Sequence, residues 1–489
     1  MPEDDLCFRS ARELAGAIRD KDLSASEVMR AHLARIEQVN PAVNAVVTLR
    51  AKEALDEARA ADDLVASGAP LGPLHGLPIA HKDTHETGGI RTTYGSPLYA
   101  EHVPERDELV VHRLRSAGAI SIGKTNVPEF AAGSHTYNEV FGVTRNPYAP
   151  DRSAGGSSGG AAAALACGMH PLADGSDMGG SLRNPASFCN VVGLRPTPGR
   201  VPTVPSALPW STLAVQGPMA RSVSDVAFML SVLAGADARS PLSLTDAPSL
   251  FAAPLDTDLT GLRVAWTPDL GGTVPVDPEV RDLVSRQVGV FEDLGCVVEQ
   301  ASPDFSGAEY AFRTLRAWQF ELAYGELLDQ HRARMKPSLV WNIEAGRRLS
   351  GPDVARAQAL QAALHQRVVG FFGEYDVLLA PVSQVAPFDA GLEYPTSVDG
   401  QPQQTYLDWM RSAYFVSMTG CPALSVPSGF TRDGLPVGLQ VIGPPRADLD
   451  VLRVGHMYET ATGHGRRRPD LTVWAGSARA PVRGDRPRE

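Results

Sequence analysis

The chain has 489 residues, of which 43% are hydrophobic and 21% are charged, and this composition is ordinary for a globular protein. Its 45 lysines and arginines against 56 aspartates and glutamates give a formal net charge of −11 at pH 7, and no basic stripe is visible, so nucleic-acid binding is not expected. Since no run of 18 apolar residues occurs, a membrane-spanning helix is not expected either.

The cysteines and the first residues predict a cytoplasmic protein. The five cysteines are scattered, without a CxxC pair or a compact framework, which favours reduced thiols over disulfides. Residues 1–5 include three acidic side chains, whereas a secretory signal begins with basic residues and continues with apolar ones.

The first elements in chain order are predicted to be helices. Residues 24–27 (SASE) fit a capping box, and the helix that follows is expected to end at Asn40-Pro41. A second helix is predicted over residues 51–67, ending at Gly68. Residues 77–80 then have the character of a short strand that leads into Lys82.

Residues 118–125 (GAISIGKT) satisfy the phosphate-loop pattern of a glycine, four residues and Gly-Lys-Thr. Such a loop needs a strand before it and a helix that begins at Lys124. Here residues 107–117 predict an amphipathic helix that ends at Gly118, and residues 119–122 alternate like a strand. A nucleotide-binding enzyme remains an alternative function, but these neighbours disfavour it.

Two further patterns near the first half of the chain are also interpreted as decoys. Residues 155–159 (GGSSG) match the nucleophile elbow of α/β-hydrolases, but residues 146–152 are not expected to form the buried strand that an elbow requires. His81 and His85 have a metal-binding spacing without a clear third ligand, so surface or packing roles are favoured and no metal site is predicted.

Beyond residue 167, short apolar runs alternate with helical segments, as in residues 262–266, 280–294 and 297, and residues 377–381 form another apolar run. This alternation predicts an α/β fold with a sheet covered by helices. We expect one domain over residues 1–465. The tail from residue 466 to residue 489 is rich in Arg, Pro and Gly and is expected to be flexible.

Residues 155–200 are the most informative segment. Two Gly/Ser clusters flank an Ala-rich stretch of helical character over residues 161–167, which a flexible linker would not contain. Glycine at 179 and 180 permits close approach of a ligand to the backbone. Successive N–H groups there could point at one oxygen, as an oxyanion hole requires.

With these motifs, the chain resembles the amidase signature family. The resemblance extends from about residue 10 to about residue 465, and the phosphate-loop pattern is part of it. The matching motifs, in family order, are residues 76–78, Lys82-Asp83, 123–126, Glu129-Phe130, Gly142, Asn146-Pro147, 155–160, 179–183 and 434–440. The resemblance implies the family's fold, a central mixed β-sheet with helices on both faces, and a signature core over about residues 74–205.

The resemblance also implies the family's Ser–cis-Ser–Lys triad. Ser181 resembles the acylated nucleophile, Ser157 the bridging serine and Lys82 the base. Lysine accepts a proton only when it is neutral, and burial lowers its pKa. The backbone of Met178, Gly179, Gly180 and Ser181 is predicted to hold the oxyanion, and Ser158, Asp177 and Arg183 are predicted to fix the loop by hydrogen bonds. No cofactor is implied.

Several residues differ from the usual family motifs, and these differences help to judge the alternative functions. Met178, Asn190, Arg195 and His81 replace residues that are more common in the family, but none of the four removes a predicted catalytic atom. A glutamine-hydrolysing amidotransferase subunit usually has Gln and Tyr where this chain has Asn184 and Pro198, so that alternative is disfavoured. An inactive scaffold with a binding role is disfavoured because all three triad residues are present.

The substrate is expected to contact the two segments that the family varies, residues 201–213 and 309–409. Apolar side chains there favour a bulky or aryl amide, or an aryl carbamate (urethane), over a small acid amide; the predicted pocket residues are Trp210, Leu213, Trp318 and Trp409, with Trp341 nearby. The expected partner is this small-molecule substrate, and the protein is expected to be a monomer or a homodimer.

Overall fold

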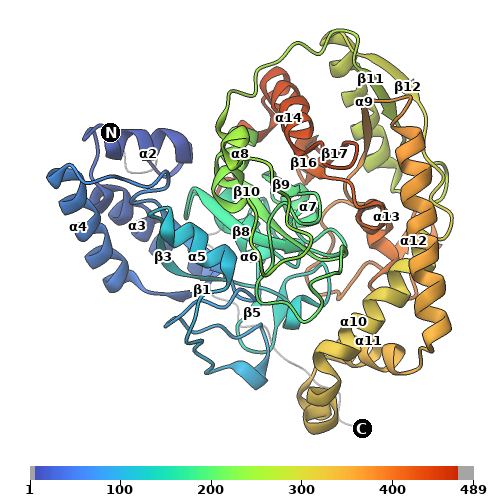
Figure 1. Ribbon diagram of the computed structural model, residues 1–489, viewed down its shortest axis with the longest axis horizontal. Coiled ribbons are helices and arrows are strands. Elements are labelled where there is room, and N and C mark those ends of the chain that lie inside the picture. The colour runs from blue at the N-terminus through green and yellow to red at the C-terminus, as the bar shows by residue number, and fades with distance from the viewer. Residues whose placement is uncertain (1–5, 472–489) are drawn as a thin grey trace.

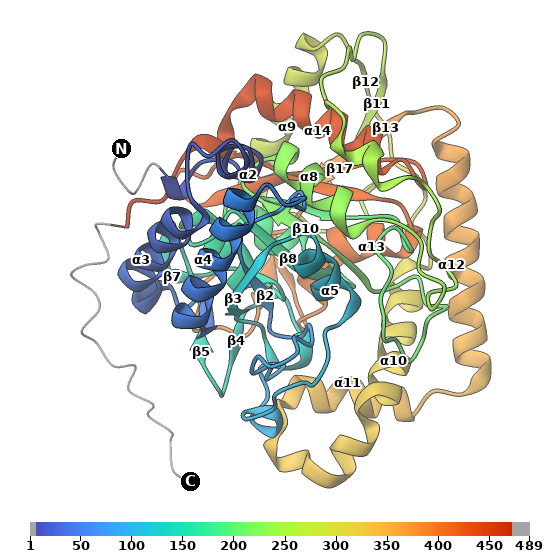
Figure 2. The same cartoon turned by 60° about the vertical axis from the view of Figure 1, so that its left-hand side comes forward.

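The structure, a computed structural model, describes residues 6–471. Figures 1 and 2 show a central layer of strands with the N-terminal helices α2 (Ala11–Arg19), α3 (Ala25–Val43) and α4 (Ala51–Ser67) on one side. The long helices α10 (Ala308–His331) and α12 (Gly351–Phe371) lie on the opposite side of the molecule, away from these three. None of the helices within residues 6–471 combines the length and apolar character needed to span a bilayer.

The larger sheet has eight strands in the order β12-β11-β13-β17-β16-β9-β10-β8. β11 pairs in parallel with β12 and β13, and the other neighbours pair antiparallel, so the sheet is mixed. Its strands are β8 (Leu172–Asp177), β9 (Val192–Arg195), β10 (Val215–Ala220), β11 (Arg263–Trp266), β12 (Val297–Gln300), β13 (Val377–Pro381), β16 (Ala423–Phe430) and β17 (Pro436–Ile442).

A smaller sheet has three strands, β1 (Val46–Leu49), β2 (Pro78–Lys82) and β3 (Ile120–Thr125), in the order β1-β3-β2. β2 lies beside β8, so the edges of the two sheets meet. Gly123 of β3 is required here because a Cβ atom would lie 1.8 Å from the Thr48 carbonyl oxygen of β1. The glycine of the apparent phosphate loop is therefore explained by strand packing.

The remaining elements surround the sheets. The helices are α5 (Leu109–Ser116), α6 (Gly159–Ala166), α7 (Arg183–Phe188), α8 (Val223–Leu233), α9 (Pro278–Asp293), α11 (Pro337–Arg347), α13 (Arg411–Thr419) and α14 (Asp448–Thr462). Short ribbons are formed by β4 (Tyr137–Asn138) with β5 (Gly142–Val143), β6 (Arg145–Asn146) with β7 (Ala149–Ser153), and β14 (Ser397–Val398) with β15 (Gln401–Pro402).

Side-chain alternation along β16 and β17 shows that helices cover both faces of the larger sheet. Leu424 of β16 packs against Gly455 of α14. On the other face, Gly438 of β17 packs against Ser187 of α7. Neighbouring residues of a strand point to opposite faces, and Gly438 is paired with Pro427, three residues after Leu424. The expected mixed sheet with helices on both faces is confirmed.

Most local predictions for the described residues hold. Ser24 caps α3 in a capping box, and α4 ends at Gly68 in the left-handed conformation. The predicted helix and strand around Gly118 are α5 and β3, and the predicted strand at residues 377–381 is β13. Cys167, Cys189, Cys296 and Cys421 are buried thiols, and none of these four forms a disulfide.

One local prediction is wrong, and two others need comment. α3 does not end at Pro41 but continues to Val43, and Asn44 then adopts the left-handed conformation. Residues 149–153 form a partly buried strand, β7, of a two-stranded ribbon, so the prediction that no buried strand of an elbow precedes residues 155–159 is confirmed. The tail is anchored at its start, where Arg467 lies 3.9 Å over the Phe430 ring; the rest of the predicted flexible tail, residues 472–489, lies outside the described residues.

Candidate active site

Lys82 ends strand β2, and its side chain is fully buried. Its Nζ donates hydrogen bonds to the hydroxyls of Ser157 at 2.8 Å, Ser158 at 2.9 Å and Ser176 at 2.9 Å. Because burial penalises the charged form, it lowers the pKa of Lys82 to about 7, although two nearby carboxylates act in the opposite direction. At neutral pH a substantial fraction of this lysine is therefore uncharged and able to accept a proton.

Ser157 lies in the turn between β7 and α6, and the Gly156–Ser157 peptide bond is cis. The neighbouring loop holds this turn by side-chain hydrogen bonds. Ser134 Oγ donates to the Gly156 carbonyl at 2.7 Å, and Thr136 Oγ1 donates to the Gly155 carbonyl at 2.8 Å. The turn thereby keeps the Ser157 hydroxyl against the lysine.

Ser181 lies in the turn that follows β8 and is 8% exposed. Ser157 and Ser181 both line one cavity of about 230 Å³. The Ser158 N–H donates to the Ser181 carbonyl at 3.2 Å, which ties the two serine turns together. The three predicted triad residues thus converge from separate segments: Lys82 is bonded to Ser157, and Ser157 shares a cavity with Ser181.

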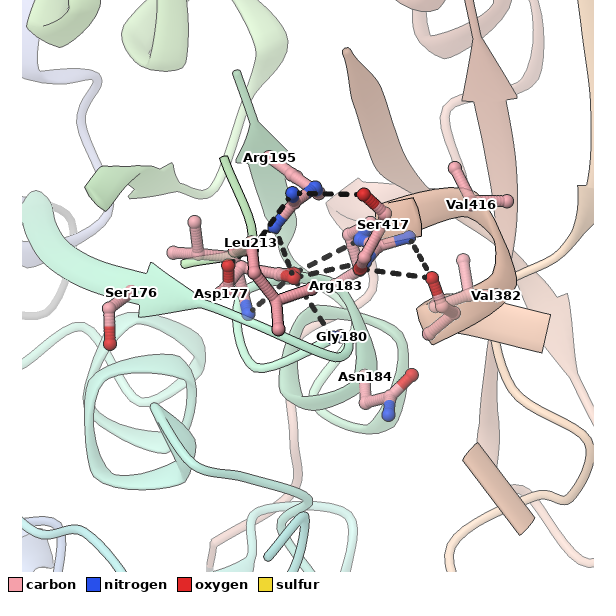
Figure 3. Close-up of polar contacts among 12 residues, drawn as sticks. Ser176, Asp177, Gly180, Arg183, Asn184, Arg195, Leu213, Val382, Val416 and Ser417 are labelled. Carbon is pink, nitrogen blue, oxygen red and sulfur yellow. Dashed lines mark hydrogen bonds and ion pairs between the residues drawn. The ribbon is translucent and has the colours of Figure 1, made fainter. Parts of the chain in front are cut away.

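A buried ionic cluster fixes the turn that carries Ser181 (Figure 3). Asp177, at the end of β8, lies 3.0 Å from the Arg183 guanidinium and 3.3 Å from that of Arg195. Its carboxylate also accepts the N–H groups of Gly180 at 2.9 Å and Leu182 at 3.2 Å. Desolvation opposes the charge of Asp177, but the two arginines outweigh it and hold the pKa of Asp177 below its usual range.

These contacts correct part of the predicted oxyanion hole. The Gly180 N–H is already donated to Asp177 Oδ1, so it does not point at a ligand. The N–H groups of Gly179 and Ser181 donate to no other described residue, and both residues line the cavity. Two preorganised donors on one turn are sufficient to stabilise a developing oxyanion.

A second buried carboxylate, Asp174 of β8, joins the two sheets. It accepts the backbone N–H of Lys82 at 2.7 Å, Nδ1–H of His85 at 2.9 Å and Nδ1–H of His81. Desolvation opposes its charge, but the two histidines outweigh desolvation and hold the pKa of Asp174 well below its usual range. Both histidines are buried, so the packing interpretation holds and the surface interpretation is wrong. Residues 6–471 contain no cluster of three or more metal-ligating side chains.

Lys124, the lysine of the phosphate-loop pattern, is fully buried within β3. Its Nζ donates to the His85 carbonyl and to Thr87 Oγ1, the latter at 2.9 Å. A lysine bonded in this way inside a strand is not available to the phosphates of a nucleotide. The segment therefore does not form a phosphate loop.

Aromatic rings line the cavity that holds the two serines. They belong to Tyr94, Phe130, Phe320 and Tyr324, and the Phe130 and Tyr324 centroids are 4.6 Å apart. Phe130 has a left-handed backbone with φ of 47°, which is uncommon for a bulky residue and is found where the surroundings impose it. Together the rings provide an apolar wall beside the serines.

Arg316 of α10 is the charged side chain among the described residues that line this cavity. Its guanidinium lies 4.2 Å over the Phe320 ring, donates to the Tyr406 hydroxyl at 2.8 Å and approaches Met178 Sδ at 3.0 Å. The Nε atom of Arg316 has no hydrogen-bond partner within residues 6–471. The cavity therefore combines an apolar wall with one buried positive charge.

The predicted pocket residues require a correction, because none of them lines this cavity. Trp210 is 73% exposed. Trp409 is buried against the Phe388 ring, with centroids 5.1 Å apart. Leu213 is buried, Trp318 packs at the edge of the core, and Trp341 is exposed beside Tyr406.

Other residues at the site were missed by the sequence analysis. Arg316, Phe320 and Tyr324 follow one another at intervals of four residues, the spacing that places side chains on one face of a helix, and they lie in the variable segment 309–409. This four-residue spacing was the feature of the sequence that could have predicted a shared helix face. Asp174 and Ser176 alternate along β8 with small residues, a polar pattern unusual in a buried strand.

Comparisons with known proteins agree with this geometry. The family model described as Amidase matches residues 27–452. An acylamidase of Rhodococcus erythropolis is 37% identical, with 96% of this chain and 98% of that protein covered. A glutamyl-tRNA(Gln) amidotransferase subunit of Moorella thermoacetica is also 37% identical, with 96% and 100% covered. The crystal structure of a bacterial aryl acylamidase of the amidase signature family superimposes with a TM-score of 0.87 at 30% identity, covering 97% and 99%.

Proposed function

Because the chain belongs to the amidase signature family and is a hydrolase of carbon–nitrogen bonds, we propose that it cleaves an aryl or similarly bulky acyl amide through an acyl-enzyme on Ser181. The observation that carries this proposal is the fully buried Lys82, bonded at 2.8 Å to Ser157, which shares a cavity with Ser181. A weak hydroxyl nucleophile needs such a base beside it.

In the proposed mechanism, neutral Lys82 accepts a proton from Ser157, and Ser157 accepts the proton of Ser181. The Ser181 oxygen attacks the amide carbonyl, and the N–H groups of Gly179 and Ser181 stabilise the oxyanion. When the C–N bond breaks, the proton returns through Ser157 to the leaving amine. A water molecule then attacks the acyl-enzyme by the same proton route and releases the acid.

The four aromatic rings of the cavity support an aryl or bulky apolar acyl group, because such rings gain stability by stacking and by burial of apolar surface. The resemblance to an acylamidase and an aryl acylamidase points in the same direction. An aryl carbamate presents a similar carbonyl and the same kind of ring, so carbamates belong to the proposed substrate range.

A second candidate, a glutamine-hydrolysing amidotransferase subunit, is supported by two observations. The relative from Moorella thermoacetica is as similar as the acylamidase. Arg316 also brings a buried positive charge to the cavity, which suits a substrate carboxylate. The aromatic wall disfavours glutamine, whose side chain offers little apolar surface.

A hydrolysis screen distinguishes the aryl amidase from the glutamine-hydrolysing amidotransferase subunit. The purified protein is assayed with anilides, aryl carbamates, acetamide and glutamine, and released amine or ammonia is measured. We expect the aryl substrates to have the higher kcat/KM, because only they bury apolar surface against the rings. Arg316→Met serves as a matched variant: it should leave anilide turnover within a small factor but abolish any glutamine turnover. Equal or faster hydrolysis of glutamine by the unaltered protein would reject the aryl proposal in favour of the second candidate.

A further inference from the structure

A second cavity lies next to the one that holds the serines. It has a volume of about 260 Å³ and shares Thr84, Ser176 and Ala214 with the first. Ser176, labelled in Figure 3, accepts a hydrogen bond from Lys82 Nζ at 2.9 Å. One hydroxyl therefore links the buried lysine to both cavities.

The second cavity is lined by buried hydrogen-bond acceptors that the protein leaves unused. Glu108 Oε2 and Gln216 Oε1 have no partner within residues 6–471. Gln216 is 4% exposed, and its Nε2 donates to the other Glu108 oxygen at 2.8 Å, which orients the amide with Oε1 as the free acceptor.

His85 lines the same cavity. It is 2% exposed, and its Nδ1–H donates to Asp174 at 2.9 Å. Its Nε2 has no partner among the described residues. Leaving a buried acceptor without a donor is unfavourable. The unused oxygens of Glu108 and Gln216 in one cavity therefore indicate an occupant with N–H donors.

We propose that this second cavity binds a small primary ammonium group, either the ammonium ion or a short alkylammonium. Such a group carries at least three N–H donors and a positive charge, which suit two free oxygen acceptors, one of them on a carboxylate. Burial raises the pKa of Glu108, so a bound cation would favour the ionised form of this carboxylate.

The position of the cavity suggests its part in the reaction. Cleavage of an amide releases an amine, and Ser176 and Thr84 stand between the two cavities. An amine that leaves Ser181 can move across these side chains and be held as its ammonium form away from the acyl-enzyme. This role rests on the proposed hydrolysis, whereas the binding itself does not.

Binding is tested without turnover. The melting temperature of the unaltered protein is measured during titration with methylammonium chloride at mildly alkaline pH. Parallel titrations with tetramethylammonium chloride, which has the same charge but no N–H donor, and with potassium chloride keep the ionic strength matched. We expect a saturable rise in melting temperature with methylammonium only, since a ligand that binds the folded state stabilises it. An equal shift with either control salt, or no saturable shift, would overturn the proposal.

Substitutions test whether methylammonium stabilises the protein by binding in the second cavity. Glu108→Gln should weaken methylammonium binding about tenfold or more, because it removes the charged acceptor. Gln216→Met, which keeps the side-chain volume, provides a second variant and should also weaken binding. Glu101→Gln removes a carboxylate whose side chain is 91% exposed, and its affinity should match that of the unaltered protein. Unchanged affinity in both cavity variants, each showing cooperative unfolding, would refute the site whether or not the protein hydrolyses amides.

Discussion

At the scale of single residues, the proposed chemistry depends on a buried lysine whose Nζ has no carboxylate in direct contact. Lys82 forms no ion pair with a described residue, and its Nζ is bonded to three serine hydroxyls. Hydroxyls bond the neutral amine as well as the ammonium, so burial determines which form prevails. The same lysine on the surface would remain charged and would be useless as a base at neutral pH.

The pH dependence of kcat/KM follows from this environment. Burial lowers the pKa of Lys82 to about 7, from the usual value near 10.5. Below that pH the ammonium predominates and cannot accept a proton, so kcat/KM for a substrate without titrating groups should rise through pH 7 and then level off. The profile is measured with an anilide under subsaturating conditions. A rate that falls as the pH rises through 7 would contradict the role of Lys82 as base.

Substitutions separate the roles of the three predicted triad residues. Ser181→Ala should abolish the covalent adduct with a serine-directed fluorophosphonate. Ser157→Ala and Lys82→Ala should lower amide turnover by about two to four orders of magnitude, since each breaks the proton path. Lys82→Ala should affect activated esters less, because their leaving group departs without a proton. Adduct formation is followed by mass spectrometry.

The control for this series is Ser116→Ala, at the exposed end of α5, which should behave like the unaltered protein. A fluorophosphonate adduct on Ser157 in the Ser181→Ala protein would reassign the nucleophile. Full amide turnover in Lys82→Ala would remove the lysine from the mechanism.

At the scale of elements, β2 is joined to β8 by side chains, above all by Asp174. The backbone of β2 does not pair with β8 in the sheet order, and Asp174 accepts the N–H of Lys82 in place of a ladder bond. The same carboxylate accepts from two histidines of the β2 segment. A side chain thus performs the task that strand pairing performs elsewhere in the sheet, and it does so directly beside Lys82, the proposed base.

Asp174→Asn is predicted to be strongly destabilising. The amide keeps one acceptor but loses the charge that faces two buried histidines, and removal of one partner from a buried polar pair costs about 3–5 kcal/mol. The free energy of unfolding is measured by urea titration. As a control, Asp329→Asn removes an exposed carboxylate paired with Arg347 and should not change the midpoint. Equal midpoints for the two variants would show that Asp174 does not hold the strands together.

The elements also show what the sequence could predict. The α4 boundary was predicted correctly because the alanine-rich stretch and Gly68 are local signals. β7 was not predicted as a strand because Pro150 and the polar residues around it hide a partly buried strand that pairs only with its partner in the ribbon. The triad candidates came from a resemblance to family motifs, whereas the cavity wall is assembled from Tyr94, Phe130 and the face of α10, whose proximity no single stretch of sequence encodes.

At the scale of the whole molecule, the candidate site bridges the two sheets. Lys82 belongs to the smaller sheet, and Ser181 follows a strand of the larger one. Separation of the sheets would dismantle the site even if each sheet kept its own strands. Activity is therefore a sensitive measure of their contact.

Unfolding in urea should reveal this dependence. All six tryptophans lie at or after position 210, outside the smaller sheet, so their fluorescence reports on the rest of the chain. We expect anilide hydrolysis to be lost at the same urea concentration as the fluorescence transition or below it. Activity is measured at each urea concentration after equilibration and corrected for inhibition of the folded enzyme. Activity that persists beyond the fluorescence transition would show that the sheets do not need to stay in contact.

The cluster around Asp177 also bears on how the protein is made. Arg183 bonds Asp177 within the serine turn, and its other nitrogens bond Ser417 and Gln440, the latter 257 positions further along the chain. A ribosome adds about 5–20 residues per second, so roughly ten to fifty seconds separate the synthesis of Arg183 from that of Gln440. During that interval the turn that carries Ser181 lacks the contacts that Arg183 makes with Ser417 and Gln440. The proposed nucleophile therefore gains its complete set of supporting contacts only when synthesis is almost finished.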